Sequence, residues 1–304
     1  SVREVWRRQV ISNDVWPVRA DHGCDVALDP SAVPLLWNVR HHRCQSFEAA
    51  TGEPVGCVEY ELDGAFRRNY GPWRIGTGAG GRRAITVVSE MVQTHVHGLI
   101  LHEDGTPELA WERYYGEVYV VPGVAVEFLG VEDVDGDGAH EVVYNVRDPE
   151  NDFRSFTRCR DVATGEVKYE FEDHWCSAFV SCVGASQQAL LLLHPASEGA
   201  TPEQGPAKLV SLTAGRPETR MEVGHGGPWG ITAVAGQTGS DLLLRIVDSQ
   251  GPAVVRFDGS TFEEIDRLTA AETLDSPAAA SARVDGVLQI ASTCGTFQWP
   301  HNDA

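Results

Sequence analysis

The sequence predicts an all-β fold, a single β-propeller spanning residues 1–304 with six blades, or seven as the alternative. Three observations support this prediction. First, residues 36–40 (LWNVR) followed by Thr51-Gly52-Glu53 are echoed by residues 143–147 (VYNVR) followed by Thr164-Gly165-Glu166. Second, landmark residues recur at intervals of 47 to 57. Third, 31 glycines and only 2 methionines suit many short strands joined by tight turns.

The repeating unit is an apolar strand, a polar connection, a second strand and a glycine turn. Weaker copies of the turn are Asp104-Gly105-Thr106, Ala214-Gly215-Arg216 and Asp258-Gly259-Ser260. The landmarks that open the six units are Trp16, Trp73, Val124, Trp175, Trp229 and Ser276. Their spacing is near the period of a four-stranded blade, roughly 40–50 residues. Because the last unit is too short for a whole blade, we expect residues 2–11 (VREVWRRQVI) to supply its missing strand and close the ring.

Composition excludes several partners. The net charge of −20 disfavours nucleic acid and anionic membranes. No apolar run approaches the ~18 residues of a membrane span. The start at Ser1 shows no signal-peptide pattern, as expected also of a mature chain whose leader has been removed.

The seven cysteines are odd in number and form no C-x-x-C pair. One or two disulfides are compatible with this count, and at least one thiol stays unpaired within the chain. The cysteines therefore do not decide the compartment.

The nine residues 133–141 (DVDGDGAHE) form the strongest motif. Carboxylates at positions one, three, five and nine belong to Asp133, Asp135, Asp137 and Glu141, with two glycines between them. Calcium takes six to eight oxygen ligands and favours such a loop. Because the loop leads into an apolar strand rather than a helix, we predict a structural calcium site between two strands. The alternative is an ordinary acidic turn. A degraded counterpart at Asp21, Asp25 and Asp29 lacks the D-x-D-G core and contains His22 and Cys24, and we expect no second ion there.

Propeller geometry sorts the remaining candidates onto one face. Connections between the second and third strands of a blade lie on the same face as the blade-to-blade crossovers, whereas the calcium loop, a first-to-second connection, lies on the other. We place residues 40–43 (RHHR), residues 93–97 (QTHVH) and His194 on the former connections. The crossovers add residues 67–74 (RRNYGPWR), 173–175 (DHW) and 225–229 (HGGPW). This face then collects histidines, arginines and tryptophans.

Arginine forks hold carboxylates in a bidentate way, aromatic rings stack on sugars, and histidine exchanges protons near neutrality. These properties fit an acidic polysaccharide that contains uronic acid. The predicted substrate-binding residues are His41, Arg43, Arg68, Trp73, His174, Trp175, His194, His225 and Trp229. The alternative for the tryptophans is packing between blades.

The calcium loop and its following strand resemble the FG-GAP/VCBS type of calcium-binding propeller repeat over residues 124–147, and the whole pattern is similar to propeller-fold polysaccharide lyases of the rhamnogalacturonan or ulvan type. The resemblance implies β-elimination beside a uronate by histidine, tyrosine and arginine, in a secreted or periplasmic protein. The candidate catalytic residues are His42, His97, His95, Tyr70 and Arg74.

In this hypothesis an arginine (Arg74, Arg43 or Arg68) neutralises the substrate carboxylate. A histidine, His42 or His97 or His95, abstracts the C5 proton, and Tyr70 protonates the leaving oxygen.

Three other functions are alternatives. A non-catalytic propeller that binds carbohydrate or protein fits the fold equally well. A zinc site at His41, His42, Cys44, His95 and His97 is a further hypothesis, which requires tetrahedral convergence. Hydrolysis by paired carboxylates has no support beyond the calcium loop.

Overall fold

The computed structural model describes residues 27–29, 35–40, 43–60, 71–90, 93–117, 123–181, 189–196, 206–213, 216–223, 230–233, 242–248, 251–257, 261–267, 279–284, 287–292 and 295–299. The chain divides into two compact units, one of residues Ser1–Glu132 and Gly138–Glu170, the other of Asp133–Asp137 and Phe171–Ala304. That residues 1–304 form a single domain, as the sequence indicates, stays a prediction. The ring-closing strand at residues 2–11 lies outside the described residues.

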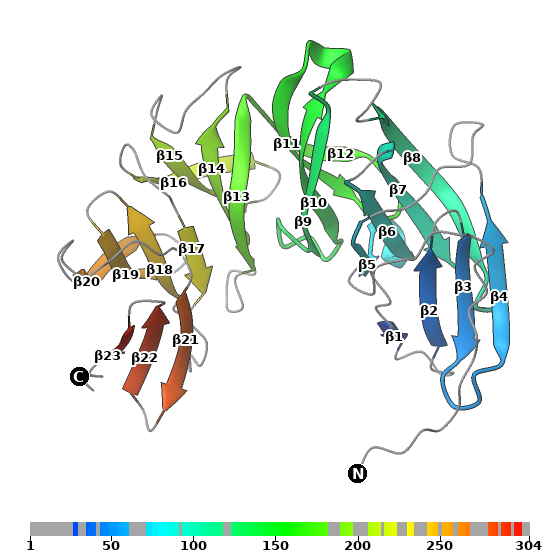
Figure 1. The fold of residues 1–304 in the computed structure, drawn as a ribbon, viewed down its shortest axis with the longest axis horizontal. Coiled ribbons are helices and arrows are strands. Elements are labelled where there is room, and N and C mark those ends of the chain that lie inside the picture. The colour runs from blue at the N-terminus through cyan, green and yellow to red at the C-terminus, as the bar shows by residue number, and fades with distance from the viewer. Residues whose placement is uncertain are drawn as a thin grey trace. The chain divides into compact units, whose positions relative to one another are not determined.

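The described strands form successive antiparallel sheets, each built from strands that follow one another in the chain (Figure 1). In the first unit, sheet 1 contains β1 (Ala27–Asp29), β2 (Leu35–Arg40), β3 (Arg43–Glu48) and β4 (Pro54–Glu59). Sheet 2 contains β5 (Trp73–Thr77), β6 (Arg83–Ser89), β7 (Gln93–Leu101) and β8 (Pro107–Glu117). Sheet 3 contains β9 (Ala125–Glu132), β10 (Glu141–Asp148), β11 (Arg154–Asp161) and β12 (Val167–Glu172).

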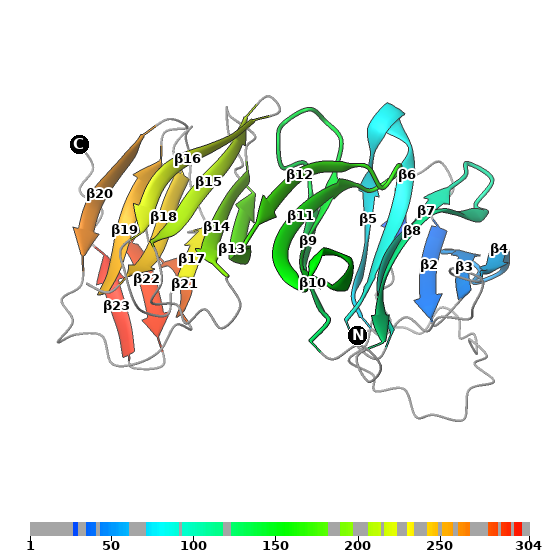
Figure 2. The same cartoon turned by 90° about the horizontal axis from the view of Figure 1, so that it is seen from above.

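The second unit repeats this arrangement, and Figure 2 shows its strands side by side. Sheet 4 contains β13 (His174–Ser181), β14 (Ala189–Pro195), β15 (Ala207–Thr213) and β16 (Arg216–Val223). Sheet 5 contains β17 (Gly230–Ala233), β18 (Leu242–Asp248), β19 (Gly251–Phe257) and β20 (Phe262–Arg267). A three-stranded sheet 6 contains β21 (Ala279–Val284), β22 (Val287–Ser292) and β23 (Gly295–Trp299).

Successive four-stranded meanders are the repeating unit of a β-propeller, and the predicted all-β propeller fold class is confirmed. The only helical turns in the described residues are two short 3-10 helices, η1 (Ala79–Gly81) and η2 (Pro149–Asn151). No helix in the described part of the chain has the length and apolar character that a membrane crossing needs.

The first glycine turn joins β3 to β4 and is closed by its own backbone. Gly52 N donates to Glu48 O at 2.7 Å, and Glu48 N donates to Glu53 O at 2.8 Å. Thr51 Oγ1 donates to the Glu48 carboxylate at 2.6 Å. Gly52 has φ of 71°, a left-handed conformation that glycine adopts without steric cost.

The second glycine turn, between β11 and β12, repeats the same bonds. Gly165 N donates to Asp161 O at 2.9 Å, and Asp161 N donates to Glu166 O at 3.0 Å. Thr164 Oγ1 donates to Asp161 Oδ1 at 2.9 Å, and Gly165 has φ of 72°. The sequence repeat therefore corresponds to a structural repeat at the connection between the third and fourth strands.

The apolar cores lie between neighbouring sheets within each unit. One cluster joins sheets 1 and 2, with Trp37, Trp73, Ile85 and Leu99 among its members. A second joins sheets 2 and 3 and includes Val88, Val126, Tyr144 and Phe156. A third joins sheets 4 and 5 and includes Leu190, Leu192, Val255 and Phe257. Burying such side chains contributes about 1.5–3 kcal/mol each.

A buried polar network joins β10, β11 and β12 of sheet 3, and it reaches sheet 2 through Tyr115, which accepts from Arg158 Nη1 at 3.3 Å. Arg158 Nη1 donates to Asp148 Oδ2 at 2.7 Å, and its Nε donates to Glu170 at 2.6 Å. Its guanidinium also lies 4.5 Å from the Phe156 ring centroid. Arg158 and Asp148 are both buried, so each depends on the other for charge compensation.

Candidate functional site

The predicted calcium loop connects β9 to β10, the first two strands of sheet 3, as the sequence indicated. Gly136 and Gly138 have φ of 78° and 85°, which are the left-handed values that this tight turn requires. Asp133 Oδ1 accepts from Gly136 N at 2.8 Å, and Asp135 Oδ1 accepts from Asp137 N at 3.2 Å. These bonds hold the first two carboxylates on the inside of the loop.

Three carboxylates of this hairpin converge. One oxygen each from Asp133, Asp135 and Glu141 lies within 4.8 Å of the others, and no other such group occurs among the described residues. Glu141 is buried at the start of β10. Asp137, the fourth predicted ligand, is exposed and is not part of the converging group. A set of hard carboxylate oxygens fits calcium, which also accepts backbone carbonyls and water.

Lys168 on β12 is a neighbour of the loop that sequence reasoning missed. Its Nζ contacts Glu141 Oε1 at 2.7 Å. A carboxylate has two oxygens and can pair with an ammonium and a metal ion together. No sequence spacing signals this contact, because it joins strands that are 27 residues apart.

His140 fixes the end of the loop, and sequence reasoning did not single it out either. His140 N donates to Thr77 O at 2.7 Å, and Val162 N donates to His140 O at 3.1 Å. Thr77 N lies 3.0 Å from His140 Nδ1, in reach of a further hydrogen bond. These contacts within the first unit fix the start of β10, where Glu141 lies.

Many of the other candidates lie outside the described residues. They are His41, His42, Arg68, Tyr70, His225 and Trp229. Asp21 and Asp25 of the degraded loop also lie outside them, and Asp29 ends β1.

His95 and His97 lie inside strand β7, which corrects their predicted place on the connection before it. Both side chains are buried, and their rings stack at a centroid distance of 5.2 Å. His97 Nε2 lies 3.1 Å from Tyr60 Oη. Burial, together with the charge of His95, holds the pKa of His97 well below its usual range, so this imidazole is neutral at neutral pH.

The arginine and tryptophan candidates of the first unit pack against or pair with neighbouring residues of the fold. Trp73 is 2% exposed in the core between sheets 1 and 2, in agreement with the packing alternative. Arg43 forms an ion pair with Glu59. Arg74 is exposed, and its guanidinium lies 5.9 Å from the Phe128 ring centroid.

Three predicted substrate-binding residues come together at one end of sheet 4. Trp175 on β13 is paired in register with His194 on β14, whereas the adjacent His174 faces the opposite side of the sheet. The three residues lie inside strands, which corrects their predicted place on connections. All three are partly exposed. Ser177 Oγ lies 2.7 Å from His194 Nε2, and partial burial lowers the pKa of His194.

Among the described residues, no histidine and cysteine side chains converge as the zinc hypothesis requires. Cys44 is buried and unpaired, and burial, with Cys57 nearby, raises the pKa of its thiol far above the usual range. In the absence of a metal ion its sulfur is therefore a neutral thiol. His41 and His42 lie outside the described residues, so this site stays a hypothesis.

Sequence comparisons identify no relatives: no protein-family profile and no curated protein matches the chain. Solved structures with similar folds include the C-terminal domain of PilY1 from Pseudomonas aeruginosa, at 11% identity and TM-score 0.40, covering 89% of this chain and 67% of that one. The Dos1 propeller has 11% identity and TM-score 0.42, covering 89% and 68%. The periplasmic gluconolactonase PpgL of P. aeruginosa has 15% identity and TM-score 0.40, covering 87% and 77%. At these values the comparisons carry no argument about function.

Proposed function

We propose that this chain is a calcium-stabilised β-propeller that binds a carbohydrate or protein ligand without transforming it. The convergence of the Asp133, Asp135 and Glu141 oxygens in one hairpin supports the calcium site. Bound calcium would supply positive charge among these carboxylates and so brace the β9–β10 connection. Millimolar calcium is an extracellular resource, which favours a secreted or periplasmic location.

The burial of His95 and His97 favours binding over catalysis. A general base must come within hydrogen-bond reach of the proton that it abstracts. Both imidazoles are fully buried, and His97 contacts Tyr60 rather than solvent. Two of the proposed bases are therefore out of hydrogen-bond reach of a polymer at the protein surface.

Calcium is expected to raise the thermal stability of the protein. At a free concentration 100-fold above the dissociation constant, a ligand that binds only the folded state stabilises it by about 2.7 kcal/mol. Magnesium should have a smaller effect, because it requires stricter octahedral geometry and retains water. The measurement is the unfolding midpoint in EDTA, calcium and magnesium.

The matched variants are Asp133→Asn/Asp135→Asn and Asp152→Asn. The double variant should lose the calcium response. Asp152 is exposed and has φ of 53°, which asparagine also adopts, so its variant should respond as the original chain does. An unchanged midpoint for the original chain in calcium would contradict the proposal.

The uronate-directed lyase is the second candidate, and the pairing of Trp175 with His194 favours it. A neutral, partly exposed histidine beside an indole could accept a proton from a sugar stacked on the ring. The substrate would be an acidic polysaccharide, and the test is ultraviolet absorbance of an unsaturated uronate after digestion. Loss of that absorbance in His194→Ala would support the candidate, whereas an inactive original chain across a broad polysaccharide panel would exclude it.

A further inference from the structure

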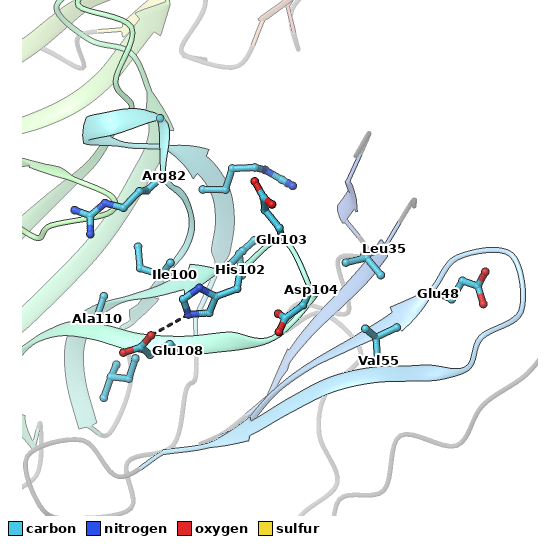
Figure 3. A pocket seen from close by; sticks show the side chains of 14 residues that line it. Leu35, Glu48, Val55, Arg82, Ile100, His102, Glu103, Asp104, Glu108 and Ala110 are labelled. Carbon is cyan, nitrogen blue, oxygen red and sulfur yellow. Dashed lines mark hydrogen bonds and ion pairs between the residues drawn. The ribbon is translucent and has the colours of Figure 1, made fainter. Parts of the chain in front are cut away.

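A large pocket lies in the first unit between sheet 1 and the β7–β8 hairpin of sheet 2 (Figure 3). Its volume is about 1200 Å³, above the roughly 300–1,000 Å³ of most small-molecule sites. None of the residues predicted from the sequence as catalytic, substrate-binding or metal-binding lines it. Its size suits a segment of polymer better than a single small metabolite.

The inner wall of the pocket is apolar. Leu35 and Val55 come from sheet 1, and Leu101 and Leu109 come from β7 and β8. Val55 is 43% exposed and is one of three large hydrophobic side chains among the described residues that are classed as exposed. Val55 therefore offers a ligand in the pocket an accessible apolar side chain next to Leu35.

The rim of the pocket is predominantly acidic. Its charged lining residues are Glu48, Glu103, Asp104, Glu108, Arg82 and Arg83, so carboxylates outnumber guanidinium groups by two. Figure 3 shows Glu103 and Asp104 on one side of the opening, with Glu48, Val55 and Leu35 on the other.

Two rim carboxylates have well-defined surroundings. Thr106 donates its backbone N–H and its hydroxyl to Asp104 Oδ1 at 2.9 and 2.6 Å. Glu108 pairs with His102 at 2.9 Å. Asp104 is therefore fixed in orientation at the pocket edge, where it can receive a cation.

We propose that this pocket binds an extended basic peptide in which lysine or arginine side chains alternate with apolar ones. Alternate side chains of an extended chain point to opposite sides, so the apolar set can reach Leu35 and Val55 while the basic set meets the rim. The net charge of −20 attracts such a ligand from a distance. This inference rests on the proposed binding function and names its partner class.

The probe is a fluorescein-labelled hexapeptide of alternating lysine and leucine, followed by fluorescence anisotropy in calcium at low and physiological salt. Saturable binding is expected. Because an exposed charge pair contributes about two- to fivefold, Glu103→Gln/Glu108→Gln should weaken binding about tenfold. A peptide with glutamate in place of lysine should not bind.

Matched controls separate the pocket from bulk charge. Glu166→Gln/Glu222→Gln removes two exposed carboxylates outside the pocket and should leave the affinity nearly unchanged. Val55→Ser should weaken binding, whereas Val167→Ser should not; Val167 follows the equivalent glycine turn in sheet 3 and is 37% exposed.

The outcomes distinguish the two proposals. The pocket assignment would be overturned if the peptide did not bind, or if the pocket and control variants weakened binding equally. Calcium binding measured on the same samples would still support the calcium-stabilised module in that case. Absent calcium binding, or release of unsaturated uronate, would overturn the proposed function instead. Circular dichroism of each variant establishes that a loss of binding does not come from unfolding.

Discussion

Replacing Arg158 with methionine is expected to lower the free energy of unfolding by about 3–5 kcal/mol, the cost of leaving a buried charge without its partner. Asp148 is buried and accepts from Arg158 at 2.7 Å. Glu170 and Tyr115 lose hydrogen bonds from the same guanidinium. The measurement is urea denaturation at neutral pH, and Arg158→Met should unfold at the lower urea concentration.

Two comparisons test the cause of this loss. Arg256→Met removes an ion pair with Glu263 in which both side chains are largely exposed, and it should cost less than about 1 kcal/mol. The double variant Arg158→Met/Asp148→Asn should be more stable than Arg158→Met, because it removes the stranded charge. Equal losses in Arg158→Met and Arg256→Met would contradict the account of the buried network.

The same pair predicts how stability depends on pH. Burial alone would raise the pKa of Asp148, but the hydrogen bond and charge of Arg158 outweigh it and lower that pKa below its usual value. A carboxyl with a depressed folded-state pKa stabilises the fold above its unfolded pKa, and this contribution is lost as pH falls through the folded value. Because the unpaired Asp148 of Arg158→Met keeps only the burial effect that raises its pKa, the advantage of the original chain should be larger at neutral pH. It should shrink as the pH falls towards the depressed pKa of the paired Asp148.

Replacing Gly165 with alanine is expected to cost about 2–5 kcal/mol. Gly165 has φ of +72°, which costs an L-residue about 1–2 kcal/mol. An added Cβ would also lie 2.5 Å from Cδ2 of Trp111, and such overpacking costs about 1–3 kcal/mol. The indole cannot move away easily, because Gly98 also lies close against it and Val162 O accepts from its Nε1 at 3.0 Å.

Gly80→Ala provides the control for Gly165→Ala. Gly80 has φ of +70°, and no atom of the described residues lies within 4 Å of the position that an added Cβ would occupy there. It should incur the conformational cost alone, measured by the same urea denaturation. Equal destabilisation in the two variants would mean that a Cβ at position 165 has no steric conflict with Trp111.

The fold class could be predicted because its signals are local. The Thr-Gly-Glu turns form the bonds that their residues favour in isolation, with threonine and the preceding carboxylate closing a turn that glycine permits. The turn of the predicted calcium loop is equally local, since the backbone N–H groups of Gly136 and Asp137 donate to its first two carboxylates. Such features need no knowledge of the rest of the chain.

The misplaced or missed residues depend on long-range contacts. His95 and His97 lie on the same face of β7 as Leu99 and Leu101, but their polarity suggested a loop. His97 contacts Tyr60, which follows β4 of sheet 1 and is 37 residues away in the sequence. Lys168 reaches Glu141 in the same way, through sheet pairing that spacing does not reveal.

Isothermal titration of the metal-free protein with calcium tests the central claim most directly. The account predicts one calcium ion per chain, with a dissociation constant on the order of 10⁻⁴–10⁻³ M as in extracellular modules, and no binding by Asp133→Asn/Asp135→Asn. A metal-free original chain that takes up no calcium, or a double variant that binds it equally well, would contradict the claim.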